Sequence, residues 1–173
     1  MTIGRFIERH SLYTDQQRAQ AAESLAQIGE VGIEVVRLAW PDQHGLLRGK
    51  SMSREGYASA LHNGVEITMA PFFFDTANAI VFNPFSADGG FDIPGLQGSP
   101  NVVMVPDPGT FKVLPWAPET AWVMCDLYMR DGTPFPLAPR AILKKQLEEL
   151  SKEGMRFIAG LEVEWYLTRL VDD

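Results

Sequence analysis

The chain has 173 residues, 46% hydrophobic and 21% charged, so it is too apolar for a disordered protein and has the composition of a globular one. Its net charge of −7 argues against nucleic acid or an anionic membrane as the main partner, and no apolar run approaches the about 18 residues that span a bilayer. The single cysteine, Cys125, excludes an intrachain disulfide and a cysteine-cluster zinc site, and a charged N-terminus without a signal-peptide pattern leads us to expect a cytoplasmic protein.

The chain opens with a predicted helix and a predicted hairpin. Thr14 begins the helix with capping-box spacing, apolar residues follow at helical period, and Gly29 ends it. A β-rich run over 33–40 is then followed by a turn over 41–45 and a returning strand over 46–52. Two such strands around a short polar turn are typical of a β-hairpin.

A short helix and a long irregular stretch come next. Ser53 is a cap for a helix over 54–62, with Asn63 and Gly64 as its stop signal. Residues 71–100 are rich in Phe, Gly, Pro and Asp and show no steady period. Loops of this length within a domain are usually functional or mobile.

Three strands are predicted after the long loop, over 101–105, 110–114 and 120–128. Strands around one or two helices in this order favour a small α+β domain that ends near Arg130.

A second unit begins at Asp131. Pro139 suits the first turn of a helix that Gly154 ends. The apolar side chains of this helix predict a buried stripe: Ile142, Leu143, Leu147 and Leu150. A strand is predicted over 157–167, and because one helix and one strand cannot cover each other, we expect the chain to stop within its second domain.

Two carboxylates stand out in this last predicted strand. Strand alternation places Glu162 and Glu164 on one face, with their Cα atoms about 6.6–7 Å apart. Oxygen ligands so placed suit Mg²⁺ or Mn²⁺, each carboxylate holding a different ion of a pair. The alternative is an exposed strand edge whose glutamates contact solvent.

Four stretches in order resemble the glutamine synthetase family. Residues 160–167, Gly-Leu-Glu-Val-Glu-Trp-Tyr-Leu, are similar to its metal-binding strand, Gly-x-Glu-x-Glu-aromatic-aromatic-Leu. Residues 42–50 are similar to its Asp-x-x-Gly-x-x-Arg-Gly-Lys hairpin. The other two stretches are 103–110 and 125–128, the latter continuing through Gly132, Pro139 and Arg140. The match extends over most of the chain, from Val35 to Leu167.

The resemblance implies an α+β fold with a β-grasp-like domain over 32–130, preceded by a helical segment over 1–31. Residues 131–173 would be the truncated start, a helix plus a strand, of the catalytic domain. The family uses ATP to phosphorylate the γ-carboxylate of glutamate, and ammonia or an amine then displaces the phosphate from γ-glutamyl phosphate. By the same resemblance, Glu162 and Glu164 would be Mg²⁺ or Mn²⁺ ligands in an enzyme of nitrogen metabolism that is active only at full length.

The family's Phe-Asp-Gly-Ser-Ser loop is altered here to Phe-Asp-Thr-Ala-Asn over 74–78. Its aspartate, Asp75, would hold the ammonium or amine, in a site shared with a neighbouring subunit of a homo-oligomer of stacked rings, a dodecamer. Aromatic residues at 72–74 beside a carboxylate would suit an organic ammonium, which favours the γ-glutamyl-amine or polyamine branch. The alternative is that these phenylalanines belong to the core and Asp75 caps a turn.

A rival interpretation is a non-catalytic β-grasp module that binds a partner or a small amine. For several other polar residues a structural role is favoured. The histidines lack metal-ligand spacing, Cys125 is expected to pack as a small apolar residue, and the charges of the hairpin, Asp42, Arg48 and Lys50, are expected to be structural.

Overall fold

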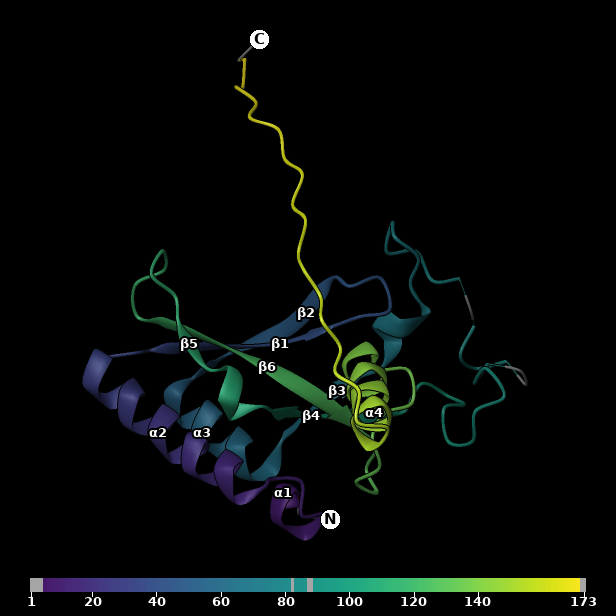
Figure 1. The fold of residues 1–173 in the computed structure, drawn as a ribbon. Helices are drawn as coiled ribbons and strands as arrows, with labels where there is room; N and C mark the ends of the chain where they lie inside the picture. Colours follow the sequence, from purple (N-terminus) through teal and green to yellow (C-terminus); the bar gives the residue numbers. More distant parts are fainter. Residues whose placement is uncertain (1–4, 82, 87–88, 172–173) are drawn as a thin grey trace.

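Six strands form one curled, mixed sheet in a computed structural model that describes residues 5–81, 83–86 and 89–171 (Figure 1). The strands are β1 (Val35–Pro41), β2 (Leu47–Ser53), β3 (Val65–Thr68), β4 (Asn101–Pro106), β5 (Lys112–Val113) and β6 (Thr120–Tyr128). Their order is β2-β1-β6-β4-β3, and β5 pairs with β6. β1 and β6 run parallel, and every other pair is antiparallel.

The predicted hairpin is confirmed as β1 and β2, with Val35 opposite Ser53. The other strands differ from the prediction at two places. β3 was not predicted, and the strand expected over 110–114 is reduced to β5, because the 3-10 helix η2 (Pro108–Thr110) takes its first residue.

Helices α1 (Phe6–Arg9), α2 (Asp15–Val31) and α3 (Arg54–Asn63) lie together on one side of the sheet (Figure 1). The predicted caps are confirmed, since Thr14 forms a capping box with Gln17 and Ser53 accepts a hydrogen bond from Gly56 N. The end of α2 is Gly32 rather than Gly29. Gly32 adopts the left-handed conformation, with φ at 76°, that ends a helix.

The core lies between these helices and the sheet. The inward positions alternate along the two central strands and belong to one buried cluster with residues of α2 and α3: Val36, Leu38 and Trp40 from β1, and Ala121, Val123, Cys125 and Leu127 from β6. Tyr57 of α3 is fully buried against this layer and shares a hydrogen bond of 3.0 Å with Ser24 of α2. Cys125 packs as predicted, and burial raises the pKa of its thiol.

Helix α4 (Pro139–Lys152) is confirmed, but its apolar stripe is not buried. Ile142 and Leu143 are 50% and 52% exposed, because no other described element covers this side of the helix. The predicted strand over 157–167 is wrong as well. Residues 155–171 form an exposed extended segment, since a strand needs a partner for its backbone groups and none of the described strands lies beside it (Figure 1).

No helix of the described chain has both the length and the apolar character that a membrane crossing needs.

Candidate functional site

The β1–β2 turn is built around a buried carboxylate. Asp42 is fully buried, and its Oδ1 accepts hydrogen bonds from His44 N at 2.9 Å and Leu46 N at 3.0 Å. Its Oδ2 accepts from Arg48 Nε at 2.8 Å. The next residue, Gly49, must be a glycine because a Cβ there would lie 1.9 Å from the backbone oxygen of Leu38. The structural role expected for Asp42 and Arg48 is confirmed.

Burial and hydrogen bonding have opposite effects on the charge of the Asp42 carboxyl. Burial opposes the charged form, but the hydrogen bonds from Arg48, His44 and Leu46 and the charge of Arg48 outweigh it, so the pKa of Asp42 lies below its ordinary value. A buried carboxylate with all these donors fixes the shape of the turn.

The loop after β3 begins with a 3-10 helix, η1 (Ala70–Phe73), that anchors it to the core. Phe72 stacks on Trp40 at 5.1 Å between ring centroids, and Phe73 stacks on Phe91 at 5.3 Å. Both are buried, at 5% and 1% exposure, so they are core residues and not an aromatic wall for a ligand. For Phe72 and Phe73 the structure therefore supports the interpretation that they belong to the core, whereas Phe74 is half-buried.

Asp75 caps the turn that follows. Its Oδ1 accepts hydrogen bonds from Ala77 N at 2.8 Å and Ala79 N at 2.9 Å. Its backbone N donates to Ala79 O, and its backbone O accepts from Asn78 N. Within the described residues Oδ2 has no hydrogen-bond partner, and the side chain is only half-buried. One carboxylate oxygen therefore builds the loop, and the other is available to a ligand.

A second charged cluster holds α4 against the sheet. Arg140 donates to Asp107 and lies 3.5 Å from Asp126, and Lys144 Nζ lies 2.6 Å from Asp126 Oδ2. Burial opposes ionisation of Asp107, but the hydrogen bond and charge of Arg140 and the charge of Lys144 lower its pKa below the ordinary value. These ion pairs join the stretches 103–110, 125–128 and 139–140, whose roles the sequence left unassigned.

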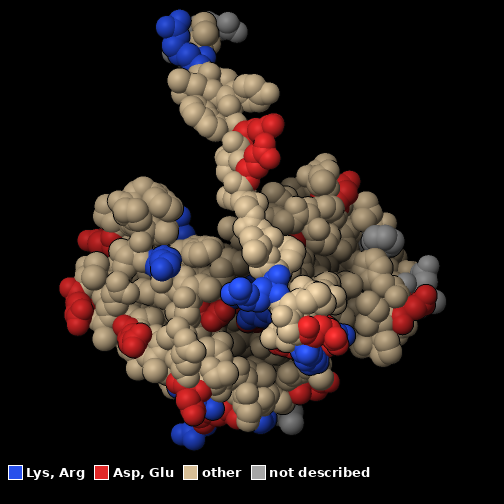
Figure 2. Space-filling view, in the orientation of Figure 1, with Lys and Arg blue, Asp and Glu red and all other residues tan. Residues whose placement is uncertain are grey.

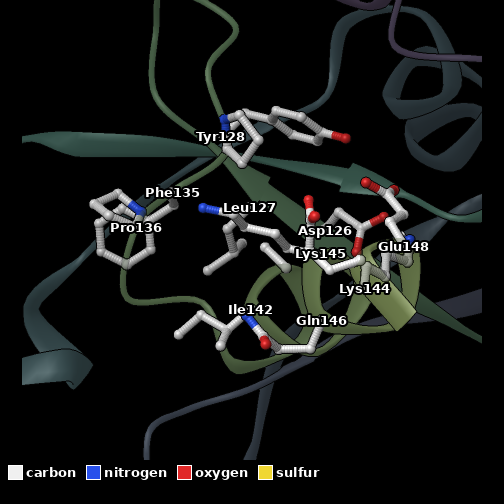
Figure 3. Close-up of a pocket in the computed structure, with 13 residues that line it drawn as sticks. Asp126, Leu127, Tyr128, Phe135, Pro136, Ile142, Lys144, Lys145, Gln146 and Glu148 are labelled. Atoms are coloured by element: carbon white, nitrogen blue, oxygen red, sulfur yellow. Dashed lines mark hydrogen bonds and ion pairs between the residues drawn. The ribbon is translucent and has the colours of Figure 1, made fainter. Parts of the chain in front are cut away.

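A cavity of about 720 Å³ opens beside this cluster, between β6 and α4. Figure 3 shows its lining, with Asp126 of β6 beside Lys144, Lys145 and Glu148 of α4 and Tyr128 apart from them. The cavity also borders Ile142 of the exposed apolar stripe.

No family model matches the sequence. The chain is 53% identical over 170 residues to the γ-glutamylanilide synthase of Acinetobacter sp, covering 96% of this chain and 34% of that protein. It is 30% identical over 156 residues to the glutamate–isopropylamine ligase of Pseudomonas sp, covering 89% of this chain and 32% of that protein. With the glutamine synthetase of Methanosarcina mazei the identity is 28% over 149 residues, covering 84% and 29%. The chain belongs to the glutamine synthetase family.

Two of these relatives are named as enzymes that join glutamate to an organic amine. They support the γ-glutamyl-amine branch of the family, which the altered loop had predicted. The solved structure of a GmaS/ADP complex superposes with a TM-score of 0.55 at 26% identity, covering 75% of this chain and 25% of that one. This confirms the predicted α+β class and the family's N-terminal domain. The chain spans about a third of the length of the curated relatives it matches.

Glu162 and Glu164 are on the exposed segment beyond α4 (Figure 2), where they are the only acidic residues between 155 and 171. The fold does not bring them to Asp75, and no group of three or more metal-ligating side chains occurs among the described residues. Their role as metal ligands stays a prediction from the family motif.

The contacts between the hairpin and the Asp75 loop could not be predicted from the sequence. Gln43 and His44 both hydrogen-bond to Phe74 O, and Arg48 Nη2 donates to Asn78 Oδ1 at 2.6 Å. These residues are about thirty positions apart in the chain, and no local pattern connects them.

Proposed function

We propose that this chain is part of an ATP-dependent ligase that joins an organic amine to the γ-carboxylate of glutamate through γ-glutamyl phosphate. The single observation that carries the proposal is the 53% identity to γ-glutamylanilide synthase along almost the whole chain. The two most similar relatives reported above are both named for amide-forming reactions of glutamate with an amine, so the non-catalytic binding module is not favoured.

Asp75 is proposed to bind the ammonium form of the incoming amine. The half-buried carboxylate keeps Oδ2 without a described partner while Oδ1 fixes the loop. Such an oxygen pairs with an ammonium group and can accept a proton as the amine attacks. Since Phe72 and Phe73 pack in the core, the organic part of the amine must be recognised by other residues.

Glu162 and Glu164 are proposed to hold Mg²⁺ or Mn²⁺. Their carboxylate oxygens are the donor type that these ions prefer, and their exposed side chains make no contact with other described residues that would have to be broken. The bound ions would neutralise charge on the phosphoryl group that ATP transfers. This assignment makes residues 131–173 the start of the catalytic domain.

The test is an assay of the full-length protein with ATP, glutamate and Mg²⁺ or Mn²⁺. ADP release should depend on both glutamate and an amine, and mass spectrometry should detect the γ-glutamyl amide. The panel is aniline, isopropylamine, ethanolamine, putrescine and ammonium, and an organic amine should give a higher kcat/KM than ammonium. A preference for ammonium would contradict the amine assignment, and no ADP release with any acceptor would contradict the ligase itself.

The proposed site is shared between neighbouring subunits of a homo-oligomeric ring. Full-length Asp75→Asn and Glu164→Gln subunits, each nearly inactive, should therefore regain activity when they are co-assembled. Random assortment around a ring leaves roughly a quarter of the interfaces with both wild-type residues. Mixed oligomers no more active than their parents would show that the two residues do not act across an interface.

A further inference from the structure

Packing anchors only the start of the loop that carries Asp75. Phe72 and Phe73 fix its start in the core, whereas each residue from Thr76 to Val81 is exposed. Residues 76–81 bury no side chain, so polar contacts must determine where the Asp75 carboxylate lies; one of them is the loop's own hydrogen bond from Val81 N to Phe73 O.

The β1–β2 hairpin supplies such contacts on both sides of Asp75. On the preceding side, Phe74 O accepts a hydrogen bond from Gln43 Nε2 at 2.8 Å and lies 2.9 Å from His44 Nε2. On the following side, Arg48 Nη2 donates to Asn78 Oδ1 at 2.6 Å. The hairpin therefore holds the loop immediately before Asp75 and three residues after it.

Arg48 is itself immobilised by the buried carboxylate behind it. Asp42 is fully buried and binds Arg48 Nε at 2.8 Å while two backbone N–H groups hold its other oxygen. Arg48 has a planar fork, so one edge pairs with Asp42 while Nη2 reaches Asn78. A lysine has a single nitrogen and cannot make both contacts in this geometry.

Asn78 connects the guanidinium of Arg48 to Asp75 through a backbone hydrogen bond. Its φ is 63°, in the left-handed region that asparagine tolerates, and its N donates to Asp75 O at 3.0 Å. The adjacent Ala77 and Ala79 amides donate to Asp75 Oδ1. Moving Asn78 therefore shifts the amides that orient the carboxylate.

We propose that Arg48 and Asn78, backed by Asp42, are positioning residues that set the orientation of Asp75 toward the incoming amine. The inference rests on the proposed function of Asp75 as the amine-binding carboxylate. It predicts an effect on the amine and not on glutamate, because the side-chain hydrogen bonds of Asp42 and Arg48 to other described residues lead only to the hairpin itself and to Asn78 of the Asp75 loop.

The decisive variant is Asn78→Gly in the full-length enzyme. Glycine keeps the left-handed backbone but removes the acceptor for Arg48. The KM for the amine should rise at least about tenfold, since small misplacements of a positioned group cost one to two orders of magnitude, while the KM for glutamate stays within about twofold. Thr76→Gly is the matched control, because it adds a glycine to the same loop at an exposed side chain that makes no hydrogen bond with described residues.

Two further variants separate positioning from folding. Asn78→Asp keeps an acceptor for Arg48 and should retain the wild-type KM for the amine within about threefold. Arg48→Lys keeps the charge beside Asp42 but should raise this KM as Asn78→Gly does. Arg54→Met is the control for losing an arginine, since Arg54 makes an exposed pair of similar length, 2.9 Å, with Glu55.

Hydrogen exchange in the same full-length proteins provides a readout that does not depend on activity. Peptides covering residues 74–81 should exchange faster in Asn78→Gly and Arg48→Lys than in wild type, Thr76→Gly or Asn78→Asp. Unchanged exchange together with an unchanged KM for the amine in Asn78→Gly and Arg48→Lys would overturn the positioning role. If exchange rises but Asp75→Asn leaves the KM for the amine unchanged, Arg48 and Asn78 still order the loop, and it is the proposed role of Asp75 that fails.

Discussion

The sheet with α1–α3 and the segment from α4 to residue 171 differ in how their apolar side chains are covered. In the first region, strand and helix faces close on each other, and Tyr57, Phe73 and Leu38 are buried. In the second region, Leu143 is half-exposed although its helix begins and ends as predicted, and the following residues extend away from the body (Figure 1). Local sequence signals therefore specify an element, whereas its burial depends on a partner surface.

The two regions meet at one charged seam, formed by Asp107 and Asp126 of the sheet region and Arg140 and Lys144 of α4. α4 makes few other contacts with the sheet. Substitutions in the core, in the seam and in the exposed stripe of α4 test this difference between the two regions.

The largest effect is expected in the core of the sheet region. Phe73→Ala should lower the free energy of unfolding of this chain by about 3–5 kcal/mol, because it leaves a cavity beside Phe91. Urea denaturation followed by fluorescence measures the change, with Phe85→Ala, at a 79% exposed residue of the same loop, as the control. A loss below about 1 kcal/mol for Phe73→Ala would show that this part of the loop is not anchored in the core.

A smaller loss is expected at the seam. Arg140→Met leaves the mostly buried Asp107 and Asp126 with Lys144 as their remaining cation, and should cost about 2–3 kcal/mol. The exposed pair removed by Arg54→Met should contribute less than about 1 kcal/mol. Equal effects of the two variants would mean that the seam contributes no more than a surface ion pair.

The seam should also make stability depend on pH. The folded pKa of Asp107 lies below its unfolded value, so its contribution is complete above about pH 4 and is lost as the pH falls through the folded pKa. Denaturation midpoints at pH 6, 4 and 3 should fall less steeply in Arg140→Met than in wild type. Parallel pH profiles would contradict a role for Arg140 in lowering the pKa of Asp107.

The smallest effect is expected on the exposed face of α4. Leu143→Ala in this chain should change the free energy of unfolding by less than about 0.5 kcal/mol, because the side chain is 52% exposed. The same substitution in the full-length protein should cost about 2 kcal/mol or more if further residues cover the stripe there. An equally small effect at full length would identify the stripe as exposed in the complete protein.

The elements that could be predicted from the sequence are those that local chemistry specifies. The capping residues Thr14 and Ser53, the β1–β2 hairpin and the start of α4 at Pro139 all depend on neighbours within a few positions, and all were predicted. The family motifs likewise identified the fold class. β3 was missed because it is only four residues long and is stabilised by pairing with β4, more than thirty positions away.

Which residues each side chain contacts depends on the tertiary structure and could not be predicted locally. Phe72 and Phe73 were equally consistent with a ligand site and with the core until packing against Trp40 and Phe91 placed them in the core. The hydrogen bond from Arg48 to Asn78 and the ion pair from Arg140 to Asp107 join positions about thirty residues apart. No local pattern encodes such a contact, because it depends on how strands and loops close in space, and for Asp75 that closure leaves Oδ2 without a hydrogen-bond partner among the described residues.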